Sequence, residues 1–288
     1  MRIAYFTAGT HGAGHIVRGN AIGAALARQQ IPHEFRIFSP DNRWSYLAGV
    51  RVCPTQIQTD LLRDPLTANS SDVALALRSW QPDLLLIDLF WVPLSLVALP
   101  CPAWLLLRSV PAAWLVGPRE ARFNAERYQR VFAIEPAPGL EPFEAIPPIV
   151  SEDVWQSRTR EELCARLSLD VDEPLRLIVQ AGLPSDDEML QNEADRQGGG
   201  FVRVPPEILT PASPWLRTLR DGDRVIAGAG YNLYWESHYF GFLEHMHFVG
   251  LPRKIDDQAW RASLHGHAIV PTPNGADVLA SQIVKQFG

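Results

Sequence analysis

The first residue that could do chemistry is a histidine that closes a glycine-rich stretch near the N-terminus. Residues 8–15 read AGTHGAGH, and a valine stands where the dinucleotide fingerprint GxGxxG would have its last glycine. Glycines let the backbone approach a ligand closely, and in open α/β sheets ligands lie beyond the carboxyl ends of the strands. We therefore expect Gly12 and Gly14 at a ligand. His15 is the candidate general base, with a helix cap as its alternative, and His11 is expected to shape the loop.

The second candidate is an aspartate at the end of a strongly apolar run. Asp88 follows the aliphatic residues of PDLLLIDLF, residues 82–90. A carboxylate at the end of a buried parallel strand either caps the next helix or belongs to a site. An imidazole that acts as a base needs a partner that holds its tautomer and stabilises its charged form. We expect Asp88 to be this partner of His15, with the helix cap as the alternative.

A third group of candidates lies in the second half of the chain. Residues 224–237, RVIAGAGYNLYWES, predict a strand, a glycine turn and a helix. The first N–H groups of a helix have no intrahelical acceptor and lie at the positive end of its dipole, so they favour a phosphate or diphosphate. Glu236 shares a helix face with Asn232, four residues earlier, and would reach a ribose. The residues expected at the nucleotide are Ala229, Gly230, Tyr231, Asn232 and Glu236. Gly182, in the turn after the predicted strand 175–181, is expected there as well.

A fourth pair of candidates opens the helix predicted from about residue 256. Asp257 and Gln258, in LPRKIDDQAWRA, offer acceptors and a donor for sugar hydroxyls. An ordinary N-cap is the alternative for this pair. His245 and His247 lie on one face of a predicted strand without making a metal site, and we predict no metal ion.

Short apolar runs alternate with longer amphipathic ones along the whole chain, as in βαβ units of a parallel sheet. Residues 136–153 are rich in proline and lack apolar periodicity, so we interpret them as a linker. We expect an N-terminal domain over 1–150 and a C-terminal domain over 151–288. The predicted strands are 2–8, 33–38, 84–88, 103–109, 175–181, 200–204, 224–227 and 246–250; the predicted helices are 16–29, one ending near 80, 92–98, 159–167, 185–196, 213–220, 232–240, one from about 256, and 276–287.

Composition excludes several classes of function. The 288 residues carry a net charge of -6, opposite in sign to the basic surface of most nucleic-acid-binding proteins. The three cysteines stand far apart, which favours a reducing cytoplasm over a disulfide framework, and we expect no signal peptide. Residues 89–107 are free of charge, but Pro93, Pro100 and Pro102 interrupt them, so we predict buried strands and a short helix rather than a membrane span.

In this order and spacing, the motifs resemble those of the nucleotide-sugar glycosyltransferases of the GT-B fold, which include the peptidoglycan-precursor N-acetylglucosaminyltransferase and the UDP-glycosyltransferases of plants. The resemblance extends over nearly the whole chain. It implies an α/β fold with two facing Rossmann-like, doubly wound domains, the C-terminal one shortened. The motifs are G-x-x-G-x-G-H from Gly9 to His15, PDLLLIDLF, GAGYN-x-x-x-E at 228–236, and P-x-x-x-x-D-Q from Pro252 to Gln258.

The resemblance also implies roles for these residues. His15 would be the base on the acceptor hydroxyl and Asp88 its partner, Glu236 would bind the nucleotide ribose, and Asp257 and Gln258 would contact the donor sugar. The implied reaction is metal-independent, inverting transfer of a sugar from a nucleotide sugar, with UDP as the expected nucleotide, to a hydroxyl or amine. No cofactor beyond this co-substrate is expected. The acceptor would be a small molecule, lipid or glycan, and contact with a membrane surface stays open.

The second half departs from the family pattern and leaves two alternatives open. The turn after its first strand, AGLPSDD, lacks the extra glycines that receive the diphosphate, and Gly228 stands where plant-type members have a histidine. One alternative is a nucleotide-sugar epimerase, which shares the architecture and needs no acceptor. The other is a non-catalytic member that binds a nucleotide or a partner protein.

Overall fold

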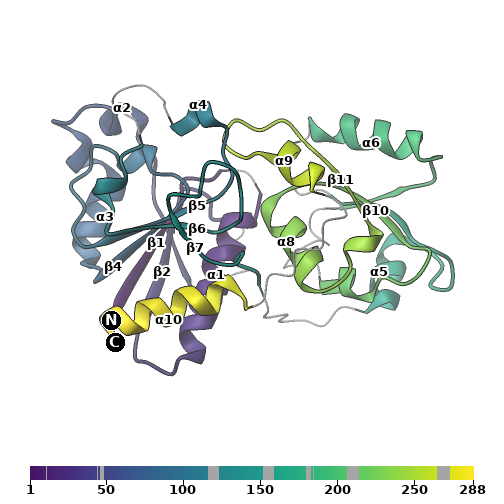
Figure 1. Cartoon of the computed structure of the whole chain (residues 1–288), viewed down its shortest axis with the longest axis horizontal. Helices are drawn as coiled ribbons and strands as arrows, with labels where there is room; N and C mark the ends of the chain where they lie inside the picture. Colours follow the sequence, from purple (N-terminus) through teal and green to yellow (C-terminus); the bar gives the residue numbers. More distant parts are fainter. Residues whose placement is uncertain are drawn as a thin grey trace. The chain divides into compact units, whose positions relative to one another are not determined.

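The chain folds into two compact units (Figure 1). The computed structural model describes residues 1–10, 12–43, 45, 49–115, 123–151, 159–179, 183, 185–205, 214–264 and 273–288. The chain passes from unit 1 to unit 2 between Ile149 and Val150, next to the expected boundary. The last helix, which we expected in the C-terminal domain, belongs instead to unit 1. Unit 1 comprises Met1–Thr10, His15–Ile149 and Pro273–Gly288, and unit 2 comprises His11–Gly14 and Val150–Thr272.

Unit 1 is built on a seven-stranded sheet whose paired strands are all parallel. Its strands are β1 (Arg2–Phe6), β2 (Glu34–Ser39), β3 (Arg51–Pro54), β4 (Leu84–Asp88), β5 (Ala103–Leu107), β6 (Arg130–Ala133) and β7 (Glu144–Ala145). Its helices are α1 (Gly14–Arg28), α2 (Thr59–Leu62), α3 (Asp72–Trp80), α4 (Ala112–Leu115) and α10 (Gly275–Phe287), with 3₁₀ turns η2 (Ala68–Ser70), η3 (Val92–Leu94) and η5 (Ala125–Arg127). The order β3-β2-β1-β4-β5-β6-β7 is the doubly wound arrangement that the sequence predicts.

Helices α1 and α10 cover one face of this sheet. Strand register places Tyr5, Ile37 and Trp104 on the same face, because paired residues of parallel strands point the same way. Gly19 of α1 lies so close to this face that a Cβ there would stand 2.9 Å from Cε1 of Tyr5. Phe287 of α10 contacts Trp104 with ring centroids 5.9 Å apart. The close approach of α1 therefore needs glycine, as the sequence predicts.

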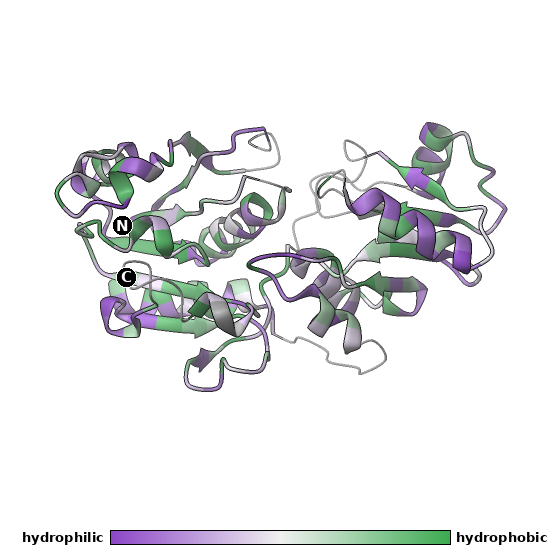
Figure 2. Ribbon diagram, turned by 90° about the horizontal axis from the view of Figure 1, so that it is seen from above, coloured by the Kyte–Doolittle hydropathy of each residue, from purple (hydrophilic) through white to green (hydrophobic). Residues whose placement is uncertain are grey.

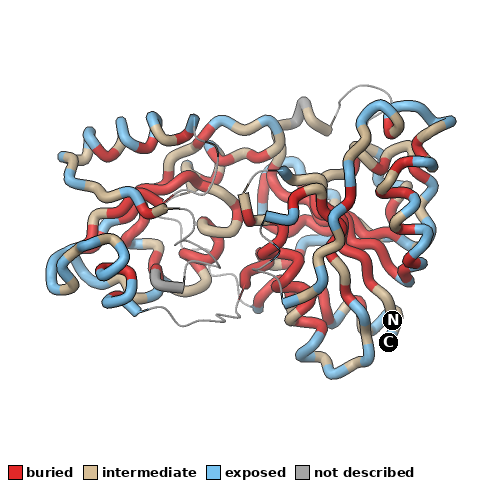
Figure 3. The backbone as a smooth tube through the Cα atoms, turned by 180° about the vertical axis from the view of Figure 1, so that it is seen from behind, coloured by how far each residue is buried: buried red, intermediate tan, exposed pale blue. Residues whose placement is uncertain are grey.

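Helix α3 covers the opposite face. Its Trp80 contacts Phe38 of β2 with ring centroids 5.6 Å apart. All residues of β4 and β5 are buried, and Figure 3 shows central strands of unit 1 in red, the colour of buried residues. Burial on both faces explains why these strands read as continuous apolar runs.

The uncharged stretch at residues 89–107 belongs to the interior of unit 1. It contains η3 and the fully buried β5. The helix expected at 92–98 is only a 3₁₀ turn, since the backbone N–H of Ala98 donates to the side chain of Asn69 at 2.8 Å rather than continuing a helix. Among the described residues, no helix combines the length and apolar character needed to cross a bilayer.

Unit 2 contains a smaller parallel sheet of order β11-β10-β8-β9. Its strands are β8 (Arg176–Val179), β9 (Val202–Val204), β10 (Arg224–Gly228) and β11 (Met246–Val249). Its helices are α5 (Arg160–Leu167), α6 (Asp186–Arg196), α8 (Tyr231–Tyr239) and α9 (Gln258–Ser263), with 3₁₀ turns η6 (Pro214–Thr218), in place of the helix expected at 213–220, and η7 (Leu243–His245). One core cluster joins Ile178, Leu190, Ala194, Ile226 and Leu251, and Figure 2 shows apolar strands beside helices with polar outer surfaces.

The proline-rich segment 136–153, which we interpreted as a linker, is partly built into unit 1. Glu144–Ala145 pairs with β6 as an edge strand, and Ile146 and Ile149 are buried. The prolines prevent a helix, while the apolar side chains between them bury against the unit. Residues 152–158 lie outside the described residues.

A buried ion pair holds unit 2 together next to β10. Arg160 of α5 donates from Nη1 to Oδ2 of Asp223 at 2.6 Å and from Nη2 to Oδ1 at 3.1 Å. Asp223 is fully buried and also accepts from the backbone N–H groups of Leu175 and Arg220. Burial acts to raise the pKa of Asp223, but Arg160 and these amides hold that pKa below its usual value. The carboxylate therefore joins three chain segments.

We expect Arg160→Met to lower the free energy of unfolding of unit 2 by about 3 kcal/mol, because it leaves a buried carboxylate without its cation. The matched control is Arg203→Met, which breaks an ion pair with Asp187 whose side chains are both 41% exposed. The control should cost no more than about 1 kcal/mol. Denaturant unfolding followed by circular dichroism measures both, and equal losses would contradict the assignment.

Candidate functional site

The carboxyl ends of β1 and β4 lie next to each other at the centre of the sheet of unit 1. β1 pairs with β2 on one side and with β4 on the other, so this is the point where the strand order reverses. Ligand sites of doubly wound sheets lie at such points. The connection after β1 leads into α1, whose first turn contains His15, and β4 ends at Asp88.

Strand register explains why the side chain of Asp88 meets α1. Tyr5 pairs with Leu86, and Asp88 lies two residues further along β4, so both side chains point to the face that α1 covers. On α1, His15 and Arg18 are three residues apart and share one helix face. The sheet and the helix thus bring these side chains together.

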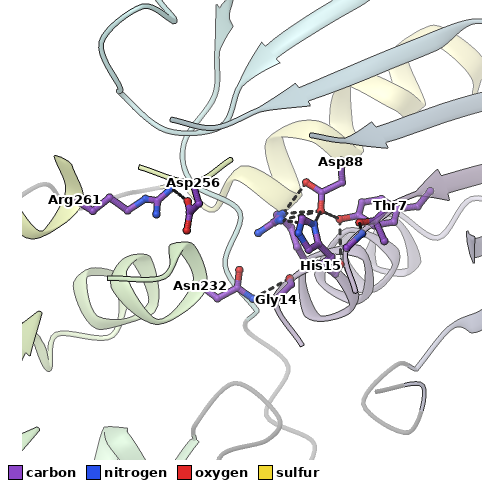
Figure 4. Close-up of polar contacts among 10 residues, drawn as sticks. Thr7, Gly14, His15, Asp88, Asn232, Asp256 and Arg261 are labelled. Carbon is purple, nitrogen blue, oxygen red and sulfur yellow. Dashed lines mark hydrogen bonds and ion pairs between the residues drawn. The ribbon is translucent and has the colours of Figure 1, made fainter. Parts of the chain in front are cut away.

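Three residues donate to the carboxylate of Asp88, which is fully buried (Figure 4). His15 Nδ1 lies 2.6 Å from Oδ2. Arg18 donates from Nη2 to Oδ2 at 2.8 Å and from Nε to Oδ1 and Oδ2 at 3.1 and 3.2 Å. The hydroxyl of Tyr5 also donates to Oδ2. The structure therefore brings His15 and Asp88 together as the sequence predicts, and adds Tyr5 and Arg18.

The geometry defines which nitrogen of His15 carries the proton. Oδ2 of an ionised Asp88 can only accept, so the contact of 2.6 Å assigns a proton to Nδ1. Arg18 Nη2 also lies 3.1 Å from Nδ1, but a guanidinium nitrogen cannot accept a hydrogen bond, so it does not compete with Asp88 for the Nδ1 proton. In the neutral ring, Nε2 therefore keeps its lone pair and can accept a proton.

Burial keeps the imidazole neutral, and the neighbouring cation keeps its partner ionised. Burial lowers the pKa of His15, Asp88 opposes that effect, and Arg18 and Arg108 add to it, so the pKa lies below its ordinary 6.5. Burial acts to raise the pKa of Asp88, but Arg18 and His15 outweigh it and hold that pKa far below its usual value. At neutral pH the pair is thus an uncharged imidazole beside a carboxylate, which is the state required of a general base.

The imidazole ring of His15 contacts both Gly9 and Phe90. A Cβ on Gly9 would stand 2.5 Å from Cδ2 and 3.0 Å from Nε2 of the ring. The ring of Phe90 lies 5.0 Å from that of His15, centroid to centroid. The side chain of His15 is 11% exposed. Gly9, the first glycine of the N-terminal motif, is therefore required because the imidazole of His15 fills the space that a Cβ would need.

In unit 2 the corresponding point lies between β8 and β10, which leads through a glycine turn into α8. Gly230 is the N-cap of α8, and the first turn, which begins at Tyr231, lies at the positive end of the helix dipole. The amide of Ala229, which we expected to face a phosphate, donates instead to the carbonyl of Val249 at 3.0 Å. Ala229 therefore belongs to the scaffold, since the strand ladder between β10 and β11 uses its donor.

The expected sugar-binding pair divides between two roles. Gln258 is buried beside the glycine turn: Nε2 donates to Asp256 at 3.1 Å, and a Cβ on Gly230 would lie 4.0 Å from that nitrogen. Its Oε1 has no hydrogen-bond partner within the described part of the chain. Asp257 accepts from the backbone N–H of Trp260 at 3.0 Å as the N-cap of α9. The helix-cap alternative thus applies to Asp257, while Gln258 retains an acceptor for a ligand.

A buried ion pair that the sequence does not predict supports the same turn. Arg261 of α9 is fully buried and donates to Asp256 at 2.6 Å and to the carbonyl of Ala229 at 3.1 Å. Its guanidinium also lies 5.7 Å from the centre of the Tyr231 ring. This pair fixes the turn that precedes α8.

The remaining candidates are placed as follows. The side chain of Asn232 donates to the carbonyl of Gly14 at 3.1 Å, so it is used by the N-terminal loop (Figure 4). Gly12 has a φ of 74°, a conformation that favours glycine. Gly182 and His11 lie outside the described residues.

Glu236 lies in the second turn of α8 and is 3% exposed. Burial raises the pKa of Glu236 to about 8, against the opposing effect of Arg217. At neutral pH this side chain is therefore mostly the neutral acid, which can both donate and accept a hydrogen bond.

Tyr5, Arg18, Asp256 and Arg261 are the residues that sequence reasoning missed. One signal was available for Arg18: a charged residue three positions after His15, on a helix face otherwise made of glycine, alanine and aliphatic residues. A buried arginine needs a counter-ion, and Asp88 was already expected beside His15, three residues from Arg18. Tyr5 had no such signal, because its hydroxyl meets Asp88 only through the strand register.

We expect Gly9→Ala to displace the imidazole of His15, because the new methyl group would overlap the ring. Long-range ¹H–¹⁵N NMR distinguishes the two tautomers. The wild type should show the proton on Nδ1, and the variant a mixture of tautomers. The matched control is Gly14→Ala, whose Cβ would lie 3.7 Å from its nearest neighbour in ordinary van der Waals contact. An unchanged tautomer in Gly9→Ala would refute the packing argument.

We expect Glu236→Gln to change how stability depends on pH. The pKa of Glu236 is 4.5 in the unfolded chain and about 8 in the folded one, so folded protein keeps a proton that unfolded protein releases in that range. The unfolding free energy of the wild type therefore falls as pH rises from 4.5 to 8. The variant lacks this loss and should gain about 4 kcal/mol on the wild type across the range.

Denaturant unfolding between pH 5 and pH 8 measures this difference, at intervals of about one pH unit. The control is Glu188→Gln at an exposed position of α6, which should follow the wild type. A constant difference between Glu236→Gln and the wild type at every pH would rule out a neutral buried carboxyl.

Comparison with known proteins gives a fold but no sequence family. No family model matches the chain, and no curated protein matches it. Solved structures do match. Spinosyn forosaminyltransferase SpnP matches with a TM-score of 0.60 and 16% identity, over 99% of this chain and 90% of that one. Phytolacca americana UGT2 complexed with UDP-2-fluoroglucose and pterostilbene matches with a TM-score of 0.55 and 15% identity, over 99% of this chain and 90% of that one. A structure from Listeria monocytogenes named as a UDP-N-acetylglucosamine 2-epimerase matches with a TM-score of 0.53 and 9% identity, over 98% of this chain and 94% of that one.

At these identities the likeness concerns the fold. It confirms the expected α/β architecture with a parallel sheet in each unit, and the expected resemblance to GT-B glycosyltransferases. The epimerase match means that this fold alone does not select one reaction. The chain has the GT-B fold.

Proposed function

We propose that this protein is a glycosyltransferase that moves a sugar from a nucleotide sugar, with UDP as the first nucleotide to test, to a hydroxyl or amine of an acceptor. The observation that carries the proposal is the contact between His15 Nδ1 and Asp88 at 2.6 Å. It leaves Nε2 of a neutral, slightly exposed imidazole able to take a proton, at the point of the sheet where ligands of this fold class bind.

In the proposed reaction, Nε2 of His15 takes the proton of the acceptor hydroxyl while its oxygen forms the new bond to the anomeric carbon. The bond from that carbon to the diphosphate oxygen breaks, and the electron pair leaves with the nucleoside diphosphate. A single in-line displacement inverts the anomeric configuration. Asp88 stabilises the imidazolium that forms. After release of the product, the proton passes to solvent.

Unit 2 is the proposed donor-binding unit. The amides of the first turn of α8 and its positive dipole end would bind the departing diphosphate, which supports transfer without a metal ion or further cofactor. Gly230 and Tyr231 would stand at the phosphates and Glu236 at the ribose. Gln258, whose Oε1 has no partner among the described side chains, would accept from a sugar hydroxyl.

The acceptor class stays broader than the donor class. We propose a small molecule, lipid or glycan as the acceptor and unit 1 as the unit that binds it. The cytoplasm is the proposed location of the protein. Pterostilbene, the compound bound to UGT2, is one small-molecule precedent on this fold. Binding of nucleic acid has no support in a chain of net charge -6.

A nucleotide-sugar epimerase is the second candidate, and the match to the Listeria structure favours it. It would convert the donor without an acceptor. A non-catalytic nucleotide-binding protein is the third, since the Ala229 amide and an Asp257 oxygen are already used within unit 2. A panel of UDP- and TDP-sugars with and without acceptors separates them: UDP release that needs an acceptor marks transfer, sugar isomerisation alone marks an epimerase, and binding without turnover marks the third.

We expect His15→Ala to lower kcat by about 100-fold or more, which is the usual contribution of a general base, and to leave the Kd for the nucleotide unchanged. Release of nucleoside diphosphate and calorimetric titration measure the two quantities. The matched control is His33→Ala, which removes an imidazole just before β2, at the amino end of that parallel strand rather than at the carboxyl ends. Full turnover in His15→Ala would exclude His15 as the base.

A further inference from the structure

Arg18 is a charged residue of the site that the proposed reaction does not yet use. It is 1% exposed and lies one helical turn after His15. A guanidinium is rarely buried unless its charge is paired, and here the pairing is with Asp88 through three hydrogen bonds. Such a contact occupies both carboxylate oxygens from one side, which fixes the rotation of the carboxyl group as well as its charge.

Without Arg18 the carboxyl of Asp88 would have a strong reason to be neutral. It has no exposed surface, and burial by itself favours the protonated form. A protonated Asp88 would carry a donor, and Nδ1 of His15 could then accept from it. The imidazole would in that case hold its own proton on Nε2 and could not serve as a base.

We propose that Arg18 is a positioning residue that acts on His15 through Asp88. It holds the carboxylate ionised and oriented so that His15 keeps its proton on Nδ1 and presents a neutral Nε2. The link to catalysis rests on the proposed function, whereas the effect on the imidazole itself does not. Asp88 thus pairs with two cations: with Arg18 at all times, and with His15 after the imidazole has taken a proton.

The charged and titratable groups that act on His15 come from every element around it. Asp88 of β4 favours the imidazolium, while Arg18 of α1 and Arg108, which follows β5, disfavour it. Tyr5 of β1 contributes a hydroxyl donor to Asp88, and burial raises its pKa well above the usual value, so it stays uncharged. Removing the charge of Arg18 therefore lets the Asp88–His15 pair keep one more proton up to higher pH, shared between the two groups, and the titration midpoint observed at His15 should rise.

The test is an NMR titration of His15 in the full-length protein without any ligand. His15→Gln identifies its signals among the eight histidines. The wild type should show the proton on Nδ1 and a midpoint below that of an exposed histidine. Arg18→Met should raise the midpoint and lose the single tautomer, and Arg18→Lys, which keeps the charge, should restore the midpoint. The matched control is Arg28→Met on the same helix, which breaks a partly exposed ion pair with Asp277 and should leave His15 unchanged.

Turnover supplies a second readout. In Arg18→Met the acid limb of the pH profile of kcat/KM should move to higher pH, because that limb reports the base of the free enzyme. At neutral pH kcat/KM should fall about tenfold or more, with recovery of the limb position in Arg18→Lys. A merely structural role would lower activity at all pH values without moving the limb.

An unchanged midpoint and tautomer of His15 in Arg18→Met would overturn the inference, as would a wild type whose His15 carries its proton on Nε2. The wild-type measurement needs no variant, so the inference stays open to refutation even where Arg18→Met does not fold. A protein that shows the expected imidazole behaviour but no turnover with any sugar donor would contradict the proposed function and not the role of Arg18.

Discussion

The candidate site of unit 1 depends on a single negative charge held away from water. Asp88 is fully buried, and four donor groups of Tyr5 on β1 and of His15 and Arg18 on α1 surround its carboxylate. Leaving such a charge unpaired would cost several kcal/mol, so each donor is tied to the others through it. The register of β1 against β4 and the close packing of α1 on the sheet are the geometric conditions for this arrangement. Fold and site are therefore parts of the same constraint.

Much of the fold could be predicted because continuous apolar runs such as LLLID and AWLLL belong to parallel strands covered on both sides. The pairing of His15 with Asp88 could also be predicted, since both lie just past strand ends that a doubly wound order brings together. The contact of Tyr5 with Asp88 could not, because it depends on which residues pair across two strands. The donor of Ala229 could not be assigned either, since its acceptor, Val249, belongs to a strand twenty residues later in the chain.

Unit 2 shows how local motifs can mislead when the same residue types serve a helix and a ligand equally well. An aspartate before a helix can cap it or bind a sugar, and Asp257 caps α9. Its neighbour Gln258 cannot cap through the same geometry and turns instead toward the glycine turn. The buried pair of Arg261 and Asp256 holds that turn from behind, in the way that Arg18 holds Asp88. In both units, a buried arginine thus supports the residues that would meet a ligand.

The placement of α10 has a consequence for how the protein is made. Unit 1 is discontinuous: α10 packs against Trp104 and forms an ion pair with Arg28, yet it follows the whole of unit 2 in the chain. A nascent chain that has emerged only as far as β11 has α1 but still lacks α10 on that face of its first sheet. Apolar surface on β5 then stays open to solvent or to chaperones until α10 has been made. Completion of unit 1 is thereby coupled to the synthesis of unit 2.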